Sequence, residues 1–261
     1  MRSCRRSVLR HAGYALLGLL WCTGALAQQI PSASQQFSPS AGMQMDAMQM
    51  NDAALYGALL IDQLEVGAAN AGASAAWEAE GWYGGDYDKL WVRTEGEQGA
   101  TAGQDADLEL LWERIVTRWW SADAGLREDF GAGPARTWAA AGVRGMAPYD
   151  IAVEATGYAG EDGRTAARLR LESELLLSER VVLQAELEAN AYGKSDPARR
   201  VGAGLADVAA GVRVRYEVRR DLGPYLGVTY TGLCGSTASQ ALAAREPTRG
   251  LQVVVGMRAL L

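Results

Sequence analysis

Residues 165–192 read TAARLRLESELLLSERVVLQAELEANAY, and polar and apolar residues alternate along most of this stretch. In the first half, one face of an extended strand carries Leu169, Leu171, Ser173 and Leu175. The opposite face carries Arg168, Arg170, Glu172 and Glu174. A repeat of two residues is the period of a β-strand that separates an apolar environment from a polar one. The stretch therefore predicts strands, with apolar and charged side chains on opposite faces.

The second half of the stretch repeats this alternation. Its apolar or small residues are Leu183, Ala185, Leu187, Ala189 and Ala191. Between the two halves, Ser178-Glu179-Arg180 is short enough for a hairpin turn. An in-register hairpin places Arg170 opposite Glu188 and Glu172 opposite Glu186, so both strands present their charges on the same side.

Similar alternation recurs along the chain after Ala54 and predicts twelve strands. They are expected near 57–66, 75–84, 88–96, 106–115, 119–129, 136–146, 149–159, 165–177, 181–192, 206–219, 222–231 and 250–261. Ten strands is the alternative, if the first or the eleventh segment is not a strand. No segment after Ala27 has the roughly 18 to 20 consecutive apolar residues of a membrane helix. A closed barrel is the other structure that satisfies every backbone group in lipid.

The connections between these strands alternate between short turns and longer polar stretches. Short turns are expected around 84–87, 117–118, 147–148, 178–180 and 220–224. Longer stretches are expected at 67–74, 97–105, 131–135, 160–164, 193–204 and 232–249. Outer-membrane barrels have short periplasmic turns and longer external loops. We therefore predict an all-β transmembrane barrel over residues 54–261 with both termini in the periplasm.

A soluble β-sandwich is the alternative explanation for two-residue alternation. The rhythm of the loops and the charged face of nearly every strand favour the barrel. Aromatic residues near the strand ends could form interfacial girdles in a membrane barrel, or could pack in a core: Tyr83, Trp112, Trp119, Trp120, Tyr149, Tyr216 and Tyr225.

Residues 1–27 have the pattern of a secretory signal peptide. Four arginines precede an apolar run from Ala12 to Ala27, which ends in the small-residue cleavage motif Ala25-Leu26-Ala27. A lipid anchor on Cys22 is disfavoured, because the bulky Trp21 precedes it. We expect export, a cleaved signal peptide and a location in the outer membrane.

Removal of this segment limits which catalytic, metal-binding and disulfide-forming residues remain in the mature chain. It takes away His11, the single histidine, which disfavours serine-hydrolase catalysis and imidazole metal sites, so no enzyme is predicted. It also takes away Cys4 and Cys22 and leaves Cys234 without an internal disulfide partner. Without its four arginines, 21 Lys and Arg face 31 Asp and Glu, a net charge of about −10 that disfavours nucleic acid as a partner.

Residues 28–53 are rich in Gln, Ser and Met and are expected to form a flexible periplasmic arm. Within it, Gly42-Met43-Gln44-Met45-Asp46-Ala47-Met48-Gln49-Met50 holds two Met-x-Met units. Thioethers are neutral, soft ligands that favour Cu(I) or Ag(I) over zinc or magnesium. We predict a metal site at Met43, Met45, Met48 and Met50, with Asp46 between them. A linker with a chance concentration of methionine is the alternative.

The charged faces of the strands would line the interior of the barrel. Its expected carboxylates are Glu78, Glu80, Asp107, Glu109, Glu113, Glu172, Glu174, Glu186 and Glu188. Its expected cations are Lys89, Arg93, Arg127, Arg168, Arg170, Arg213 and Arg215. Most of these charges are expected to neutralise one another and to stiffen the lumen. The functional alternative is a cation path in which Glu172 and Glu186 form a station compatible with Cu(II).

Several stretches of this sequence resemble the copper resistance protein B family of outer-membrane proteins. They include 60–65 (LIDQLE), 77–91 (WEAEGWYGGDYDKLW), 109–112 (ELLW), 127–131 (REDFG), 136–139 (RTWA), 192–194 (YGK) and 215–220 (RYEVRR). The resemblance covers nearly all of the expected barrel. It implies a protein that lowers copper toxicity by binding or moving copper ions beside a periplasmic copper-handling partner.

The chain differs from that family at both ends. Its arm lacks histidine and keeps only the methionine-aspartate segment, and its last residue is Leu261 where many outer-membrane barrels have an aromatic residue. We therefore expect an outer-membrane, lipid-embedded copper protein that uses Cu(I) at the methionines and Cu(II) at lumen carboxylates. A structural or general-diffusion barrel without a metal role is the alternative function.

Overall fold

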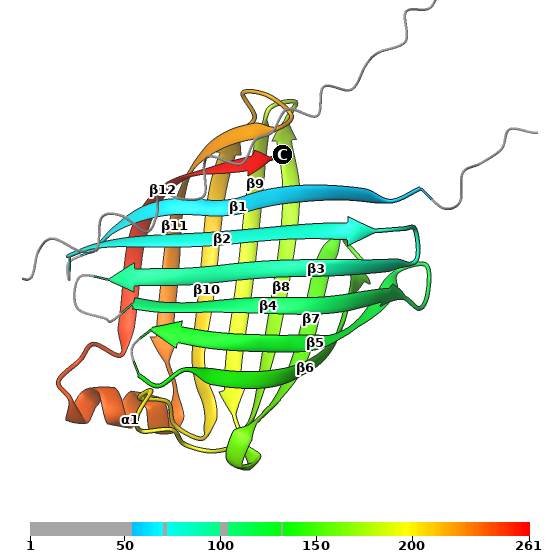
Figure 1. The fold of residues 1–261 in the computed structure, drawn as a ribbon. Coiled ribbons are helices and arrows are strands. Elements are labelled where there is room, and N and C mark those ends of the chain that lie inside the picture. The colour runs from blue at the N-terminus through cyan, green and yellow to red at the C-terminus, as the bar shows by residue number, and fades with distance from the viewer. Residues whose placement is uncertain (1–53, 70–71, 100–103, 132) are drawn as a thin grey trace, which may run out of the picture. The chain divides into compact units, whose positions relative to one another are not determined.

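The computed structural model describes residues 54–69, 72–99, 104–131 and 133–261. These residues form one closed antiparallel barrel (Figure 1). Its strands are β1 (Tyr56–Ala69), β2 (Gly72–Gly84), β3 (Asp88–Gly99), β4 (Gln104–Ile115), β5 (Trp120–Gly131), β6 (Arg136–Ala147), β7 (Ile151–Gly160), β8 (Thr165–Ser178), β9 (Val181–Tyr192), β10 (Gly204–Tyr216), β11 (Leu222–Leu233) and β12 (Arg249–Leu260). Two short helices, η1 (Glu161–Gly163) and α1 (Gly235–Ala243), lie in connections between strands.

The structure confirms the prediction of twelve strands. Each strand pairs with its neighbour in sequence, and β1 pairs with β12 to close the sheet, with Leu60 opposite Leu260 and Val66 opposite Val255. A single closed sheet also excludes the β-sandwich. In the hairpin of β8 and β9, Arg170 faces Glu188 and Glu172 faces Glu186, as the alternation predicts.

The connections correct one expectation, the regular rhythm of short and long loops. Between the strands that the structure describes, only 193–203 and 234–248 are long, whereas β1 ends at Ala69 with β2 starting at Gly72, and β3 ends at Gly99 with β4 starting at Gln104. The hydrogen-bonded ladder continues through several segments that were expected to be loops. Small residues at the strand ends, such as Gly72, Ala73 and Ser74, take part in backbone pairing without a hydrophobic side chain to reveal it.

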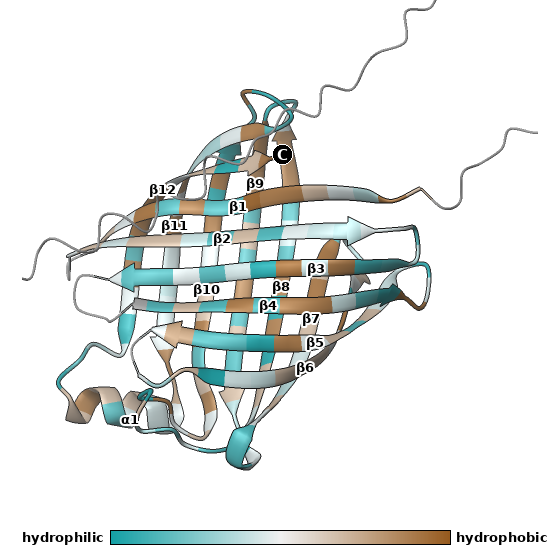
Figure 2. Cartoon of the chain, in the orientation of Figure 1, coloured by the Kyte–Doolittle hydropathy of each residue, from teal (hydrophilic) through white to brown (hydrophobic). Residues whose placement is uncertain are grey.

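The two faces of the sheet have opposite character. Outward side chains are apolar and exposed, including Leu108, Leu110, Val212, Val214 and Val253, while charged side chains such as Arg93, Glu109, Asp107 and Arg213 are buried inside. Figure 2 shows the same alternation as hydrophilic and hydrophobic bands along each strand. This arrangement is typical of a barrel whose outer surface faces lipid. Within the described ranges, no helix is long and apolar enough to span a membrane.

Aromatic side chains gather at the end of the barrel where β2, β4, β6, β8 and β10 end, which is called the short-turn end below. The opposite end, which carries 193–203 and 234–248, is called the long-loop end. Of the expected girdle, six are exposed: Tyr83, Trp112, Trp119, Trp120, Tyr149 and Tyr216. Tyr225 instead follows the alternative of packing inside, because this side chain is buried and donates a hydrogen bond to Glu65. Tyr225 lies on the lumen face of β11, where its ring fills space and its hydroxyl finds a polar partner.

The expected signal peptide and arm, residues 1–53, lie outside the described residues. The barrel unit starts at the short-turn end, because β1 begins there at Tyr56.

A lipid-facing outer surface predicts a penalty for charge that depends on depth. Leu110 lies in the middle of β4 and is exposed, and Val116 lies in the turn that follows this strand. We expect Leu110→Arg to lower the free energy of unfolding from lipid vesicles by about 2–4 kcal/mol, and Val116→Arg to lower it by about 0–1 kcal/mol. Urea titration of the reconstituted barrel, followed by tryptophan fluorescence, measures both. Equal penalties at the two positions would contradict a membrane-spanning surface.

Candidate functional site

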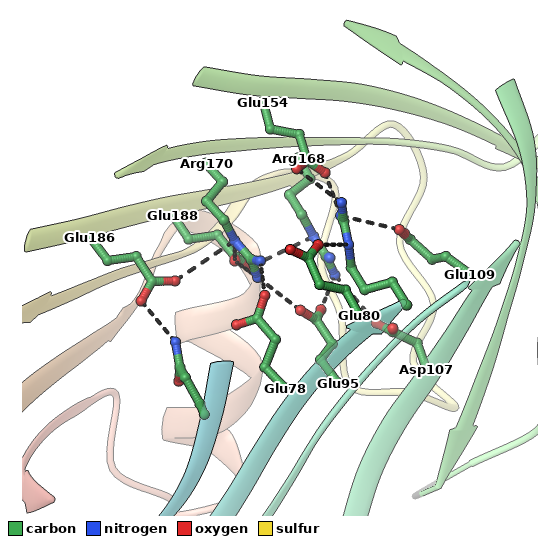
Figure 3. A network of polar contacts seen from close by, with 12 residues as sticks. Glu78, Glu80, Glu95, Asp107, Glu109, Glu154, Arg168, Arg170, Glu186 and Glu188 are labelled. Atoms are coloured by element: carbon green, nitrogen blue, oxygen red, sulfur yellow. Dashed lines mark hydrogen bonds and ion pairs between the residues drawn. The ribbon is translucent and has the colours of Figure 1, made fainter. Parts of the chain in front are cut away.

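The interior of the barrel is filled by ion pairs, which come from strands far apart in the sequence. The name "central cluster" is used below for its middle layer, Glu78, Glu95, Arg168, Arg170, Glu186 and Glu188. Figure 3 shows these side chains pointing toward one another, with Glu80, Asp107, Glu109 and Glu154 around them. The inward orientation of these side chains follows from the two-residue alternation of their strands, which turns every second side chain into the lumen.

Arg170 on β8 is the most connected residue of the central cluster. Its Nη2 atom lies 2.8 Å from Glu95 Oε2 and 2.8 Å from Glu188 Oε2, and its Nε atom lies 3.7 Å from Glu186 Oε1. Its Nη1 atom donates to Glu78 Oε1. The four carboxylates come from β2, β3 and β9, so one guanidinium joins both sides of the barrel.

Arg168 lies two residues before Arg170 on the same face. It forms an ion pair with Glu95, and it lies 3.4 Å from Asp107 Oδ2 and 3.7 Å from Glu188 Oε1. Its side chain is buried. Glu95 and Glu188 are therefore shared between two arginines, which couples the layers of the lumen.

Glu109 on β4 is the most deeply buried carboxylate among the predicted lumen residues, with a side chain 1% exposed. It accepts hydrogen bonds from Tyr158 Oη at 2.8 Å, Arg93 Nη1 at 3.4 Å and Arg127 Nη1 at 3.5 Å. Arg93 also donates through Nη2 to Glu154 Oε2 at 3.1 Å. Its Nε atom lies 3.7 Å from Glu80 Oε2.

A third arginine, Arg213 on β10, connects the central cluster to β1. Its Nη1 atom lies 2.7 Å from Glu186 Oε2, and its Nη2 atom donates to Gln63 Oε1 at 2.8 Å. Its Nε atom lies 3.2 Å from Glu65 Oε2. A register shift in β1 between Ile61 and Gln63 turns Gln63 and Glu65 into the lumen.

The short-turn end of the lumen contains the remaining predicted carboxylates. Glu172 accepts a hydrogen bond from Gln184 Nε2 at 2.7 Å and makes no ion pair within the described ranges. Glu174 lies 2.9 Å from Arg215 Nη2 and 3.2 Å from Arg258 Nη1. Glu113 accepts hydrogen bonds from Trp91 and Ser121.

All six lumen candidates, Glu78, Glu80, Glu109, Glu172, Glu186 and Glu188, face the interior, and five of them are neutralised by arginine. The structure thus supports the expected mutual neutralisation of lumen charges. In the part of the chain that the structure describes, no group of three or more His, Cys, Asp or Glu side chains is arranged to hold a metal ion. Met43, Met45, Asp46, Met48 and Met50 lie outside the described residues.

Several residues of the network were absent from the predicted set. They are Gln63, Glu65, Glu95, Asp129 and Glu154. Glu95 could have been found, because it shares the face of Arg93 two residues earlier. Glu65 could not, because the register shift in β1 reverses the simple alternation before it.

A cavity of about 520 Å³ lies between the central cluster and the long-loop end. Its lining extends from Glu78, Arg170 and Glu186 to Lys194 and Asp196. Residues of the short-turn half of the lumen, such as Glu172 and Arg215, are not among those that line it. The central cluster is therefore the floor of this cavity.

The β9–β10 connection, residues 193–203, forms part of the wall near the mouth. Asp196 Oδ2 accepts a hydrogen bond from Arg136 Nε at 2.9 Å and lies 3.6 Å from Arg164 Nε. Arg199 donates to the carbonyl oxygen of Pro134 at 3.0 Å. These contacts fasten the connection to the ends of β6 and β8 across the mouth.

Burial by itself raises the pKa of Asp196, but the hydrogen bond from Arg136 and the charges of Arg136 and Arg164 outweigh it. The pKa is therefore lower than the ordinary value of 3.8. The contribution of these ion pairs to stability is complete above the ordinary pKa. It is lost as the pH falls through the lowered pKa of the folded protein.

Comparison with known proteins gives one family. Residues 55–261 match the family described as Copper resistance protein B precursor (CopB). The chain is 41% identical over 210 residues to the Copper resistance protein B homolog of Pseudomonas syringae pv. tomato (strain ATCC BAA-871 / DC3000), covering 80% of this chain and 71% of that relative. It is 40% identical over 205 residues to Copper resistance protein B of Escherichia coli, covering 78% and 69%.

Among solved structures, the NanC porin in a rhombohedral crystal form superposes with a TM-score of 0.52 at 11% identity. The match covers 77% of this chain and 98% of that one. At this identity, the likeness concerns the barrel fold alone.

The contacts of Glu109 allow a test of whether the lumen ion pairs stabilise the folded barrel. We expect Glu109→Gln to lower the free energy of unfolding by about 2–3 kcal/mol, since Arg93 and Arg127 lose a charged acceptor, and Tyr158→Phe to lower it by about 1 kcal/mol. Urea unfolding of the reconstituted barrel compares the two. An effect of Glu109→Gln no larger than that of Tyr158→Phe would show that the ion pairs do not stabilise the barrel.

The contacts of Asp196 predict how the β9–β10 connection is fastened. We expect Asp196→Asn to increase trypsin cleavage after Arg200 severalfold at neutral pH, because the neutral amide holds Arg136 and Arg164 less tightly. Asp162→Asn removes an exposed carboxylate that pairs with Arg164 and is the matched control, with little change expected. Mass spectrometry of the fragments identifies the cleavage site.

The lowered pKa of Asp196 predicts that the effect of Asp196→Asn on stability depends on pH. The stability difference between wild type and Asp196→Asn should be constant at neutral pH and shrink below pH 3.8, as Asp196 becomes protonated in the folded state. Urea titrations at several pH values measure the difference. A gap that stays unchanged in acid would contradict the lowered pKa.

Proposed function

The chain belongs to the copper resistance protein B family and acts in copper resistance, and from this premise we propose that it binds copper ions at the outer membrane through its N-terminal methionines. The location is supported by the family and by the barrel, whose outer face is apolar along its strands. The barrel would anchor the protein in lipid, and the arm would hold the metal on the periplasmic side.

The main observation behind this proposal is that most of the candidate lumen carboxylates already form ion pairs with arginine. Glu78, Glu80, Glu109, Glu186 and Glu188 already pair with guanidinium groups, so a copper ion would have to compete with tethered arginines for their oxygens. The methionine segment has no such competitor in its own sequence, since Gly42 to Met50 contains no cationic residue. Four thioethers in eight residues supply soft ligands that need no deprotonation and favour Cu(I).

The connection between the arm and the barrel supports a periplasmic position for this site. β1 starts at Tyr56, at the short-turn end of the barrel, which is the periplasmic end in outer-membrane barrels. Met50 precedes Tyr56 by only a few residues in the sequence. Copper released by a periplasmic copper-handling protein would therefore meet the methionines close to the membrane surface. The proposed role is sequestration of the ion there, with no catalytic step.

Among the lumen candidates, Glu172 is the remaining position for Cu(II), because its described contact is an amide hydrogen bond from Gln184 rather than an ion pair. It faces Glu186 across the β8–β9 hairpin. This second station is weaker than the arm, since Glu186 is bound by Arg213.

Substitution of the arm methionines tests the proposal. We expect the variant with Met43, Met45, Met48 and Met50 replaced by Leu to bind Cu(I) at least tenfold more weakly, which corresponds to about 1.4 kcal/mol. Competition of the purified full-length protein against a chromophoric Cu(I) chelator measures the affinity. Leucine keeps the size and apolar character of methionine and removes only the sulfur ligand.

The chain offers a matched control for this measurement. Met257 lies on the outer face of β12, and Met146 lies on the lumen face near the end of β6. Their replacement by Leu makes the same chemical change outside the arm. We expect this double variant to bind Cu(I) as the wild type does. Unchanged affinity in the arm variant would refute the thioether site. Equal copper tolerance of cells that produce the arm variant and of cells that produce the control variant would favour a structural barrel without a metal role.

A further inference from the structure

Arg170 connects opposite walls of the barrel. In the order of strands around the sheet, β8 and β2 are six positions apart in a ring of twelve, so Arg170 and Glu78 stand on opposite sides of the lumen. The guanidinium nevertheless bonds to Glu78 on β2 and to Glu95 on the adjacent β3. In Figure 3 the Arg170 side chain extends away from its strand into the middle of the cluster.

The width of the barrel determines whether side chains from opposite walls can close the lumen. Eight strands enclose an interior that ordinary side chains just fill, and the diameter grows with the number of strands. A twelve-stranded barrel therefore stays open unless long side chains meet across it. Here arginine and glutamate make the crossing at the level of the central cluster. Arg93 makes a shorter connection from β3 to Glu154 on β7, four positions away, and Arg213 makes one from β10 to Glu65 on β1, three positions away.

The cavity locates the closure along the barrel axis. Its volume of about 520 Å³ lies on the long-loop side, and Glu78, Arg170 and Glu186 belong to its lining. Arg93 and Arg215, which lie beyond the central cluster, do not. The described lumen is thus a cup whose floor contains the guanidinium of Arg170.

The charges around Arg170 indicate what would pass if the floor opened. Four carboxylates, those of Glu78, Glu95, Glu186 and Glu188, converge on this one guanidinium. Arg168 and Arg213 neutralise part of this charge, but carboxylates remain in excess at this level. A lumen lined by carboxylates attracts cations and repels anions.

We propose that Arg170 is a plug of the lumen: its guanidinium closes the barrel by holding carboxylates from opposite walls, and its displacement opens a cation-selective path. Arg170 occupies the place that a passing cation would take among the four carboxylates. The inference goes beyond copper binding by the arm and does not depend on it, because it concerns only the described lumen.

Conductance in planar lipid bilayers tests the plug with potassium chloride alone. We expect the full-length wild-type protein to conduct poorly. Arg170→Ala should conduct severalfold more current, and in a salt gradient its reversal potential should shift toward that of potassium. Arg200→Ala, which removes an exposed loop arginine paired with Glu246, is the matched control and should behave as the wild type does. The slower migration of the protein after heating on a gel verifies that each variant is folded.

Two further variants keep the proposal testable if Arg170→Ala does not fold. Glu78→Gln retains the arginine and weakens only the bond to the opposite wall, and it should raise conductance by a smaller factor. In a Cys234→Ser background, Arg170→Cys should conduct, and a positively charged thiosulfonate reagent should reduce the current by restoring a cation at that position.

Three results would overturn the proposal. The first is a wild-type barrel that already conducts as well as the variants. The second is a folded Arg170→Ala protein with the conductance and selectivity of the wild type. The third is an opened path that prefers chloride. Each of these results is independent of Cu(I) affinity, so the plug and the methionine site can fail separately.

Discussion

Closure of the sheet between β1 and β12 is the constraint on which the rest of the structure depends. A strand in lipid cannot leave backbone groups without partners, and an open sheet would have two unpaired edges. The pairing of Leu60 with Leu260 and of Val66 with Val255 removes both edges. Closure also creates a lumen, and it brings strands from opposite halves of the chain to face each other across it.

The ion pairs of the lumen allow many long charged side chains to be buried inside the barrel. Long charged side chains cannot be buried alone at low cost, and here each buried arginine meets two or more carboxylates. The same ion pairs that make burial tolerable also fill the middle of the barrel. Stability and closure of the lumen are therefore properties of one network, whereas the proposed metal ligands belong to a separate segment that contains thioethers.

Local alternation accounts for much of what could be predicted. The strands, the apolar outer face and the pairing of Arg170 with Glu188 follow from two-residue periodicity and a short hairpin turn. The same reasoning fails at Gln63 and Glu65, because a register shift in β1 is invisible in the pattern. It also leaves the face of Tyr225 undecided, because an aromatic residue near a strand end suits either face until the partner, Glu65, is known.

The sequence by itself determined the class of fold, the faces of most strands, and the copper family through its motifs. Each of these depends on neighbours along the chain or on adjacent strands. Only the tertiary structure decided which charges meet across the lumen. Arg170 and Glu78 are separated by 92 residues, and their contact exists because the sheet closes and places their strands opposite each other, with five strands between them on either side. Contacts of this kind depend on the diameter and register of the whole barrel, which no local pattern specifies.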